Sequence, residues 1–483
     1  MKDQIDNKEI NDLDQSPSRV GEVEDDPSCA QDAVFGEISE DGPNYRNVGW
    51  IGTSALMIKT QIGLGVLSIP TAFDTLGMIP GVICLLAIAV ITTWSNYIVG
   101  TFKLRHRAVY GIDDAGGLMF GRLGKEFFAT AFCLYWIFVA GSGMLGVSIG
   151  LNAVSTHAAC TAIFIAVAAI VGFSLASIQT LAKITWLAWV GATCIIISIL
   201  TVTVAVGVQD RPADAPQEGV FVSDYKLVQH PSFTSAASAL SSLVFAYSGT
   251  PAFFSIVSEM REPRHYNRSM VICQSVMTAI YVSIGVVVYY FCGSYVSSPA
   301  LGSAGPTMKK VAYGFALPAL IVTTCIVIHL PGKYLFIRML RGSKHLSKNT
   351  AKHWIIWFSC TGGVTLAAYI IASAIPVFGG LVSLIGALLG TVMSVQPMGC
   401  MWLYDNWHKD RAAPSARWAL MVCWSIFVVA VGTFLMVAGT YGSVVGIIES
   451  YQVSGGSAAW SCADNSNTVC PAGGCGQAAS GGH

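Results

Sequence analysis

The chain has 483 residues, of which 53% are hydrophobic and only 11% are charged, with 27 basic and 27 acidic side chains. Soluble domains carry roughly 25% charged residues, so this composition excludes a large soluble α-helical protein. The balanced charge gives no reason to expect nucleic acid or another polyanion as a partner.

The chain begins with a polar, acidic stretch, 1–48, which we predict to be a disordered cytoplasmic tail. Beyond it, eleven apolar blocks long enough to span a bilayer recur up to residue 440. They lie at 49–71, 76–100, 128–151, 157–178, 185–208, 234–258, 270–293, 308–332, 353–375, 377–402 and 416–440. The sequence therefore predicts an all-α integral membrane protein with eleven transmembrane helices, set in a lipid bilayer and followed by a Gly/Ser/Cys tail at 441–483.

Basic residues predict how these helices are oriented. Lys and Arg crowd one set of alternate connections, whereas the other set holds only Arg211, Lys226, Lys309 and Lys310. Because short basic loops stay in the cytoplasm, we expect a cytoplasmic N-terminus and an extracellular C-terminus. We favour the plasma membrane as the location of this multi-pass protein; the vacuolar membrane is the alternative.

Three cysteines, Cys462, Cys470 and Cys475, lie in the predicted extracytoplasmic tail. That compartment is oxidising, so we expect two of them to form a disulfide. The sequence shows no ligand cluster with metal-binding spacing, and we expect neither a metal nor another cofactor.

Glycine and proline interrupt the first block, at Gly63, Gly65 and Pro70. Such residues weaken or break a helix, and in hydrocarbon the freed backbone groups need another partner. The second interruption, from Tyr247 to Pro251, lies within the sixth block. Each break begins a run of five blocks, which is the pattern of a secondary transporter with inverted repeats and a substrate site at the breaks. The freed amides near the first break suit a carboxylate, and hydroxyls and carbonyls at the second suit an ammonium group.

Several other glycines are better explained by close helix packing, which small residues favour in membranes. They are Gly52, Gly141, Gly143, Gly146, Gly150, Gly386 and Gly390.

Three stretches resemble signatures of the amino acid/auxin permease family. They are LMIKTQIGLGVLSIPTAFDTLG at 56–77, FAYSGTPAFFSIVSEMREP at 245–263 and GGLVSLIGALLGTVMSVQPMGCMWLY at 379–404. Within that family the chain is most similar to the fungal neutral amino acid permeases of the methyltryptophan-resistance type. The resemblance implies a LeuT-like 5+5 inverted repeat, 49–208 and 234–402, plus one extra helix at 416–440.

The resemblance also implies which residues bind substrate. Those expected on the carboxylate side are Thr60, Ile62, Gly63, Leu64 and Gly65. Those expected to line the second break are Phe245, Tyr247, Ser248, Gly249 and Thr250.

Three ionisable residues within or at the ends of the blocks are candidates for coupling or gating, since such groups are rare at membrane depth. Lys59 lies four residues before Gly63, and by analogy with LeuT-like folds its ammonium group would replace a sodium ion between the first and eighth helices. The alternative is a lysine that reaches the interface or pairs with a carboxylate. Glu259 is either a gate or part of a structural ion pair, and His329 either titrates or packs at the interface.

Taken together, the interrupted blocks predict a secondary active transporter that works by alternating access. The resemblance implies that it imports small neutral amino acids, aromatic ones included. We expect protons as the coupling ion, with sodium less favoured, and we find no enzyme motif. A vacuolar amino acid exporter and a non-transporting amino acid sensor on the same fold remain alternatives.

Overall fold

The structure is a computed structural model of the chain. It describes residues 31–32, 36–37, 48–63, 65–178, 181–216, 218–341, 343, 345–346, 350–375, 377–407, 415–453, 460 and 462–466. Most of the predicted N-terminal tail therefore lies outside the described residues. Within it, β1 (Gln31–Asp32) pairs antiparallel with β2 (Gly36–Glu37).

Helices make up nearly all the rest. The first group comprises α2 (Trp50–Gln61), α3 (Ile69–Leu76), α4 (Met78–Arg105), α5 (Ile112–Ser155), α6 (Thr161–Ala176) and α7 (Leu181–Val208). The second comprises α8 (Phe233–Tyr247), α9 (Thr250–Ser258), α10 (Tyr266–Cys292), α11 (Pro306–Leu340) and α12 (Ala351–Ala374). The last comprises α13 (Phe378–Leu384), α14 (Thr391–Ser394), α15 (Gln396–Asn406) and α16 (Ala416–Val453). Short 3-10 turns occupy Gly65–Ser68, Pro263–His265, Gly293–Tyr295 and Ala300–Ser303, and a π-helical turn occupies Ile385–Gly390.

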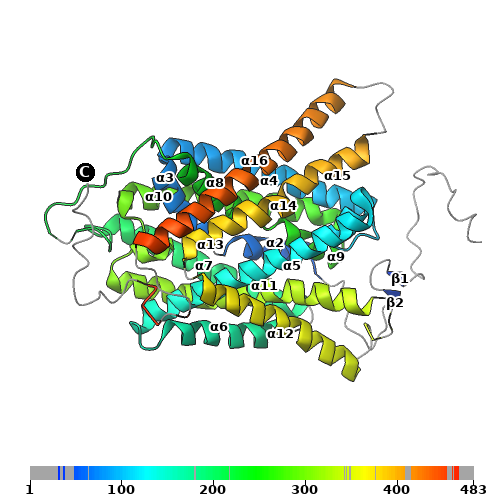
Figure 1. Cartoon of the computed structure of the whole chain (residues 1–483), viewed down its shortest axis with the longest axis horizontal. Coiled ribbons are helices and arrows are strands. Elements are labelled where there is room, and N and C mark those ends of the chain that lie inside the picture. The colour runs from blue at the N-terminus through cyan, green and yellow to red at the C-terminus, as the bar shows by residue number, and fades with distance from the viewer. Residues whose placement is uncertain are drawn as a thin grey trace, which may run out of the picture.

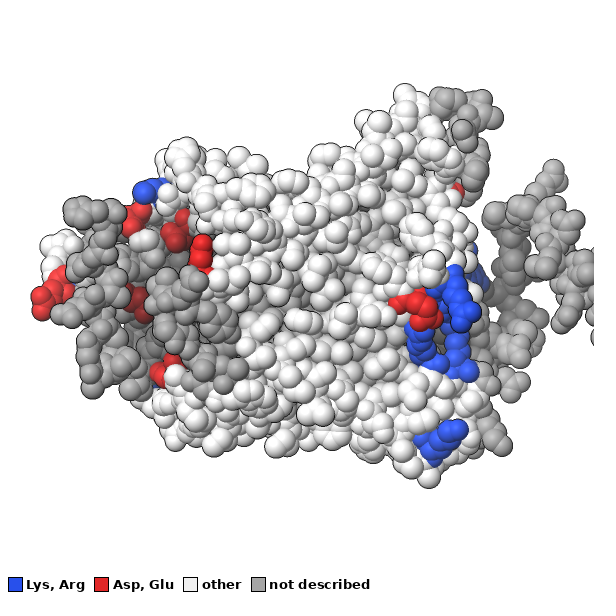
Figure 2. Space-filling model, viewed as in Figure 1, with Lys and Arg blue, Asp and Glu red and all other residues white. Residues whose placement is uncertain are grey.

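The long helices run roughly along one axis of the molecule (Figure 1). In the view of Figure 2 most of the visible Lys and Arg side chains gather at one end of this axis, with acidic side chains beside them. Most of the other visible acidic side chains lie at the opposite end, and a wide band without charged side chains separates the two ends. Among the described residues, ten helical segments are long and apolar enough to cross a membrane, and the shorter apolar helix α6 fills the remaining predicted block. The prediction of an all-α, multi-pass membrane protein is confirmed.

The two interrupted helices lie at the centre of the bundle. The most apolar stretch of the segment Trp50–Leu76 is 82% buried, and that of Phe233–Ser258 is 94% buried. By contrast, the corresponding stretch of α16 is only 22% buried, so most of α16 faces the bilayer. The broken helices are therefore enclosed by protein, as an interrupted backbone at membrane depth requires.

A third interruption divides the predicted block 377–402. A π-helical turn separates α13 from α14, and Val395 (φ −121°, ψ −66°) separates α14 from α15. A Cβ added to Gly386 would lie 2.0 Å from the carbonyl oxygen of Ser241, and one on Gly390 would lie 2.8 Å from Oγ of Ser248. These contacts confirm the packing role predicted for both glycines.

The C-terminal segment corrects the disulfide prediction. Cys462 is bonded to Cys160, in the connection between α5 and α6, and not to a cysteine of the tail. Cys470 and Cys475 lie outside the described residues. The prediction is wrong for Cys462, because the fold brings the α5–α6 connection beside this residue, and their distance in the sequence gives no sign of that contact. A bond between Cys470 and Cys475 stays a prediction.

Further contacts fix the same segment to the bundle. The side-chain amide of Asn465 accepts a hydrogen bond from Asn152 at 2.7 Å and donates one to Ser148 at 3.0 Å. Nζ of Lys309 donates to the carbonyl of Ser466 at 2.5 Å. The tail is thus attached to the ends of α5 and α11 as well as to the connection before α6.

Candidate functional site

The first break follows α2. Ile62 leaves helical geometry (φ −79°, ψ 63°), and the chain continues through Gly63 to the 3-10 turn Gly65–Ser68, which leads into α3. Thr60 is half-buried and donates from its hydroxyl to the carbonyl of Met57 in its own helix, 2.9 Å away. Leu64, predicted to bind substrate, lies outside the described residues. The predicted interruption is therefore present.

The second break separates α8 from α9. Ser248 departs from helical geometry (ψ 40°), and α9 begins at Thr250 with Pro251 in its first turn. Proline suits that position because the first amides of a helix have no acceptor within the helix. Phe245, on the last turn of α8, is buried and its Cβ lies 2.9 Å from a Cβ built on Gly386, so it packs toward the π-helical turn.

The two breaks touch each other. A Cβ on Gly65 would lie 2.5 Å from Cα of Ala246, and one on Gly249 would lie 2.7 Å from Cγ of Gln61. Contacts below 3.0 Å to backbone atoms cannot be relieved by rotating a side chain, so Gly65 is required by the approach of α8. In addition, Nε2 of Gln61 lies 3.4 Å from the carbonyl oxygen of Tyr247.

Two tyrosines reach the carbonyls that the breaks release. The hydroxyl of Tyr281, on α10, lies 2.9 Å from the carbonyl oxygen of Gln61 and 2.8 Å from that of Ala246, so it bridges the two breaks. The hydroxyl of Tyr135, on α5, donates to the carbonyl of Ser248. Each carbonyl has two lone pairs, so these bonds leave capacity for another donor.

The hydroxyl groups of the second break differ in their partners. Oγ of Ser248 donates back to the carbonyl of Val244 at 2.7 Å, and the hydroxyl of Tyr247 donates to Thr278 at 3.1 Å. Oγ1 of Thr250 is fully buried and has no hydrogen-bond partner among the described residues. A buried polar atom without a partner is costly. Thr250 therefore presents an unused donor and acceptor at the start of α9.

Lys59 lies one helical turn before the first break and is completely buried. Its Nζ donates to Oγ1 of Thr323, on α11, at 2.5 Å. A Cβ on Gly191, in α7, would lie 2.7 Å from Cε of Lys59, so this glycine makes room for the lysine chain. Among the described residues no carboxylate lies within 4.0 Å of Nζ. The ammonium group thus joins α2 to α11 through a neutral hydroxyl.

Thr323 also lies against the break itself. Its Cγ2 would be 3.1 Å from a Cβ on Gly63, and its own hydroxyl donates to the carbonyl of Ala319 at 2.9 Å. A single side chain of α11 therefore contacts both the buried cation and the interrupted backbone.

Glu259 forms a buried ion pair. Its Oε1 lies 2.6 Å from Nζ of Lys333, on α11, and both side chains are almost fully buried. The following residue, Met260, pairs with Val48 just before α2. Nearby, Lys103 donates to Ser258 and to the carbonyl of Val109. These contacts join the C-terminal parts of α4, α9 and α11.

His329, also on α11, is buried and lies away from both breaks. Its Nδ1 is 3.2 Å from the carbonyl of Ala176, and its ring contacts that of Trp357 at 5.4 Å between centroids. Nε2 has no partner among the described residues. The structure places His329 between α6 and α12, where it packs in the scaffold.

A polar cavity lies beside α3, which follows the first break, and α8, which precedes the second. It has a volume of about 270 Å³ and opens between α3, α8, α13 and α16. Its lining includes the hydroxyl-bearing residues Thr71, Thr75, Thr234, Ser238 and Ser242.

Sequence reasoning missed four residues that build this site, namely Gln61, Tyr135, Tyr281 and Thr323. Gln61 carried a usable signal, because an amide side chain directly before a glycine-rich break is costly in an apolar block. The tyrosines and Thr323 lie in other helices, and only the packing of α5, α10 and α11 reveals their role.

The fold is that of LeuT-like transporters. The chain is similar to the solved structure of Mhp1, a nucleobase-cation-symport-1 family transporter in a closed conformation with bromovinylhydantoin bound. The TM-score is 0.53, the match covers 89% of this chain and 99% of that chain, and 12% of the aligned residues are identical. It is also similar to a Na⁺-coupled sialic acid symporter in a substrate-bound outward-open state. Here the TM-score is 0.54, the match covers 86% of this chain and 93% of that chain, and the sequence identity is 11%. At these identities the likeness concerns the fold alone.

The sequence comparisons are more specific. The model of the family described as transmembrane amino acid transporter protein matches residues 46–445, and the chain belongs to that family. A transmembrane transporter of Gibberella moniliformis is 33% identical over 90% of this chain and 91% of its own length. The N amino acid transport system protein of Neurospora crassa is 32% identical over 88% of this chain and 91% of its own length. Amino acid permease 2 of Arabidopsis thaliana is 24% identical over 86% of this chain and 91% of its own length. The protein is therefore an amino acid transporter and not an enzyme.

Proposed function

We propose that this protein imports small neutral amino acids, including aromatic ones, by proton-coupled alternating access. The observation that carries the proposal is the meeting of two broken helices, with the hydroxyl of Thr250 buried beside them and unused. The stretches 60–65 and 245–250 contain no charged residue, so a substrate side chain with its own charge would find no counter-charge there. The name of the Neurospora crassa relative, an N amino acid transport system protein, agrees with amino acid substrates.

The substrate would complete the interrupted backbone. An amino acid brings a carboxylate and an ammonium group, and its ammonium can donate to the remaining lone pairs of the Ala246 and Ser248 carbonyls or to Oγ1 of Thr250. On the other side, the start of α3 supplies the positive end of a helix dipole for the carboxylate. The residues Thr60, Ile62, Gly63 and Gly65 remain our proposed carboxylate side.

Coupling is assigned to Lys59. Burying an ammonium group in a membrane is costly, and its contact here is a hydroxyl on α11. Gain or loss of the proton would change the attraction between α2 and α11, which is the kind of change that alternating access needs. While Lys59 carries its proton, a sodium ion at the same place would be repelled.

Gating is assigned to the Glu259–Lys333 pair. It ties α9 to α11 at the basic end of the molecule, while the polar cavity lies beside α3 and α8. Opening of the basic end would require this pair to separate or to move as a unit. His329, which contacts neither break, is given a supporting role in the scaffold.

We place the basic end in the cytoplasm and the protein in the plasma membrane. The basic side chains at one end of the long axis support this orientation (Figure 2). The Cys160–Cys462 disulfide supports it too, because such bonds persist in oxidising compartments.

The test is uptake of labelled amino acids by a transport-deficient cell that expresses the full chain. Competition by each of the twenty amino acids should show inhibition by neutral and aromatic ones and little by charged ones. Uptake should persist when sodium is replaced and fall when a protonophore collapses the proton gradient. Strict dependence on sodium would overturn the coupling proposal, and absence of saturable uptake at normal surface expression would favour a sensor.

A further inference from the structure

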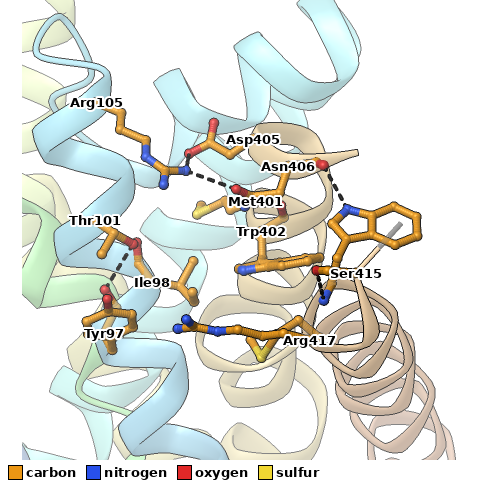
Figure 3. A pocket seen from close by; sticks show the side chains of 12 residues that line it. Tyr97, Ile98, Thr101, Arg105, Met401, Trp402, Asp405, Asn406, Ser415 and Arg417 are labelled. Atoms are coloured by element: carbon orange, nitrogen blue, oxygen red, sulfur yellow. Dashed lines mark hydrogen bonds and ion pairs between the residues drawn. The ribbon is translucent and has the colours of Figure 1, made fainter. Parts of the chain in front are cut away.

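A second site lies at the basic end of the molecule, away from the two breaks. It is a cavity of about 360 Å³ between α4, α15 and α16. The helices contribute Tyr97 and Arg105 from α4, Trp402 and Asp405 from α15, and Trp418 from α16. In Figure 3, Tyr97 and Arg105 lie across one space from Trp402 and Asp405.

Two guanidinium groups flank this cavity. Arg105 is anchored, because its Nη1 lies 3.1 Å from Oδ2 of Asp405, and Oδ1 of the same carboxylate lies 2.8 Å from Nε2 of His106. Arg417 is exposed and has no ion-pair or hydrogen-bond partner among the described residues. In Figure 3 its side chain extends from α16 across the cavity toward Tyr97 and Ile98. Among its described lining residues the cavity therefore holds one more positive than negative side chain, and Arg417 is the cation without a described partner.

The surroundings of the cavity are those expected at the level of the lipid headgroups. Trp402 and Trp418 line it, and the ring of Trp407 lies 6.2 Å from that of Trp418. Tryptophan gathers at the membrane–water interface because its ring is apolar and its N–H is polar. Nε1 of Trp418 donates to the carbonyl of Asn406 at 3.1 Å, which fixes the ring at this depth.

The helices beside the cavity face the bilayer. The most apolar stretch of α4 is only 33% buried, and that of α16 only 22%. On α16, Leu420 follows Arg417 by less than one turn and is 70% exposed, and Phe427 continues the apolar surface at 49% exposure. A ligand held at Arg417 would therefore have apolar protein surface available for hydrocarbon chains.

We propose that this cavity binds the headgroup of an anionic phospholipid. Arginine suits the phosphate, since its planar group donates two parallel hydrogen bonds. Basic pockets between transmembrane helices are known to hold acidic headgroups in this way. A soluble anion would use the charge of Arg417 but would gain nothing from the exposed face of α16, so the lipid is the occupant that uses both features.

A bound lipid would brace α15. This short helix is separated from the rest of its segment by the break at Val395, and the cavity joins it to α4 and α16. The proposal concerns lipid binding and does not depend on the transported substrate.

The test compares three full-length variants, Arg417→Gln, Arg417→Lys and Arg268→Gln, with the unmodified protein. Arg268 is an exposed arginine at the start of α10 and serves as a matched control for loss of one charge. Each protein is reconstituted in phosphatidylcholine with or without phosphatidylserine, and native mass spectrometry measures the phosphatidylserine that remains bound.

We expect Arg417→Gln to weaken phosphatidylserine binding about tenfold, which is typical for loss of a charge-assisted hydrogen bond. Arg417→Lys should lose less affinity for phosphatidylserine than Arg417→Gln does. Arg268→Gln should bind phosphatidylserine as the unmodified protein does. Equal binding by Arg417→Gln and Arg268→Gln would overturn the proposal. It would also be overturned if inorganic phosphate displaced the lipid completely, since the site would then belong to a soluble anion. Uptake is measured separately, so failure of transport and failure of lipid binding are distinguishable.

Discussion

The two breaks of the central helices are built alike but surrounded differently. The first has a buried cation one turn away, held by Thr323 of α11. The second has hydroxyl groups, of which that of Thr250 lacks a partner among the described residues, and a tyrosine from α5 that reaches the carbonyl of Ser248. This difference teaches how two related interruptions can divide the work. In the proposed function, the first break would respond to a proton and the second would recognise polar groups of the solute.

The contact between the breaks is the feature whose loss should have the largest effect. Gly65→Val places its side chain against the backbone of Ala246, where even a Cβ lies at 2.5 Å. We expect uptake to fall below detection while the protein still reaches the cell surface. The control is Gly363→Ala, in α12, where a Cβ meets nothing within 4 Å. Normal uptake by Gly65→Val would show that the breaks need not touch.

Replacing Lys59 tests whether the first break is the one that senses protons. Lys59→Met removes the ammonium group from the Thr323 hydroxyl and should reduce gradient-driven accumulation by about tenfold or more. Exchange of amino acid across the membrane without a gradient should be affected less. Uptake is measured at several external pH values in both assays. If Lys59→Met kept the pH response of the unmodified protein, the coupling group would have to be sought elsewhere.

Replacing Thr250 tests whether the second break recognises the solute. Thr250→Val keeps the shape of the side chain but removes the hydroxyl, and we expect KM to rise about tenfold if that hydroxyl binds substrate. Thermal stability should stay equal or increase, because the lost group has no partner among the described residues. Thr250→Ser is the control that restores the hydroxyl. A loss of stability together with an unchanged KM would indicate a structural hydroxyl instead.

The smallest effect is expected from the bridge between the breaks. Tyr281→Phe removes the hydroxyl that reaches Gln61 and Ala246, and should lower the free energy of unfolding by about 1–2 kcal/mol. Uptake should decrease several-fold without a change in substrate preference. Tyr313→Phe, another buried tyrosine, serves as the comparison in a thermal unfolding assay. Equal stability of both variants would mean that the bridge contributes little.

Much of the fold was predictable from the sequence because membranes impose simple rules. Helix positions follow from block length, and both breaks follow from Gly63, Gly65 and Gly249. The contacts that make a site from these breaks were not predictable. Tyr135 and Tyr281 are ordinary members of apolar helices in the sequence, and the partner of Glu259 proved to be Lys333, 74 residues away. The division into repeats at 49–208 and 234–402 stays a prediction, as do the substrate-binding roles.

The Cys160–Cys462 bond has a consequence for counting the spans. Two thiols can join only when they emerge on the same side of the bilayer, so the chain between them must cross it an even number of times. In the part of the chain that the structure describes, ten segments qualify as spans by length and composition, and α6 does not. Between the two cysteines, however, seven segments qualify, and seven is an odd number. They are the segments of α7, α8–α9, α10, α11, α12, α13–α15 and α16. Parity therefore requires that the short helix α6 also traverses the membrane.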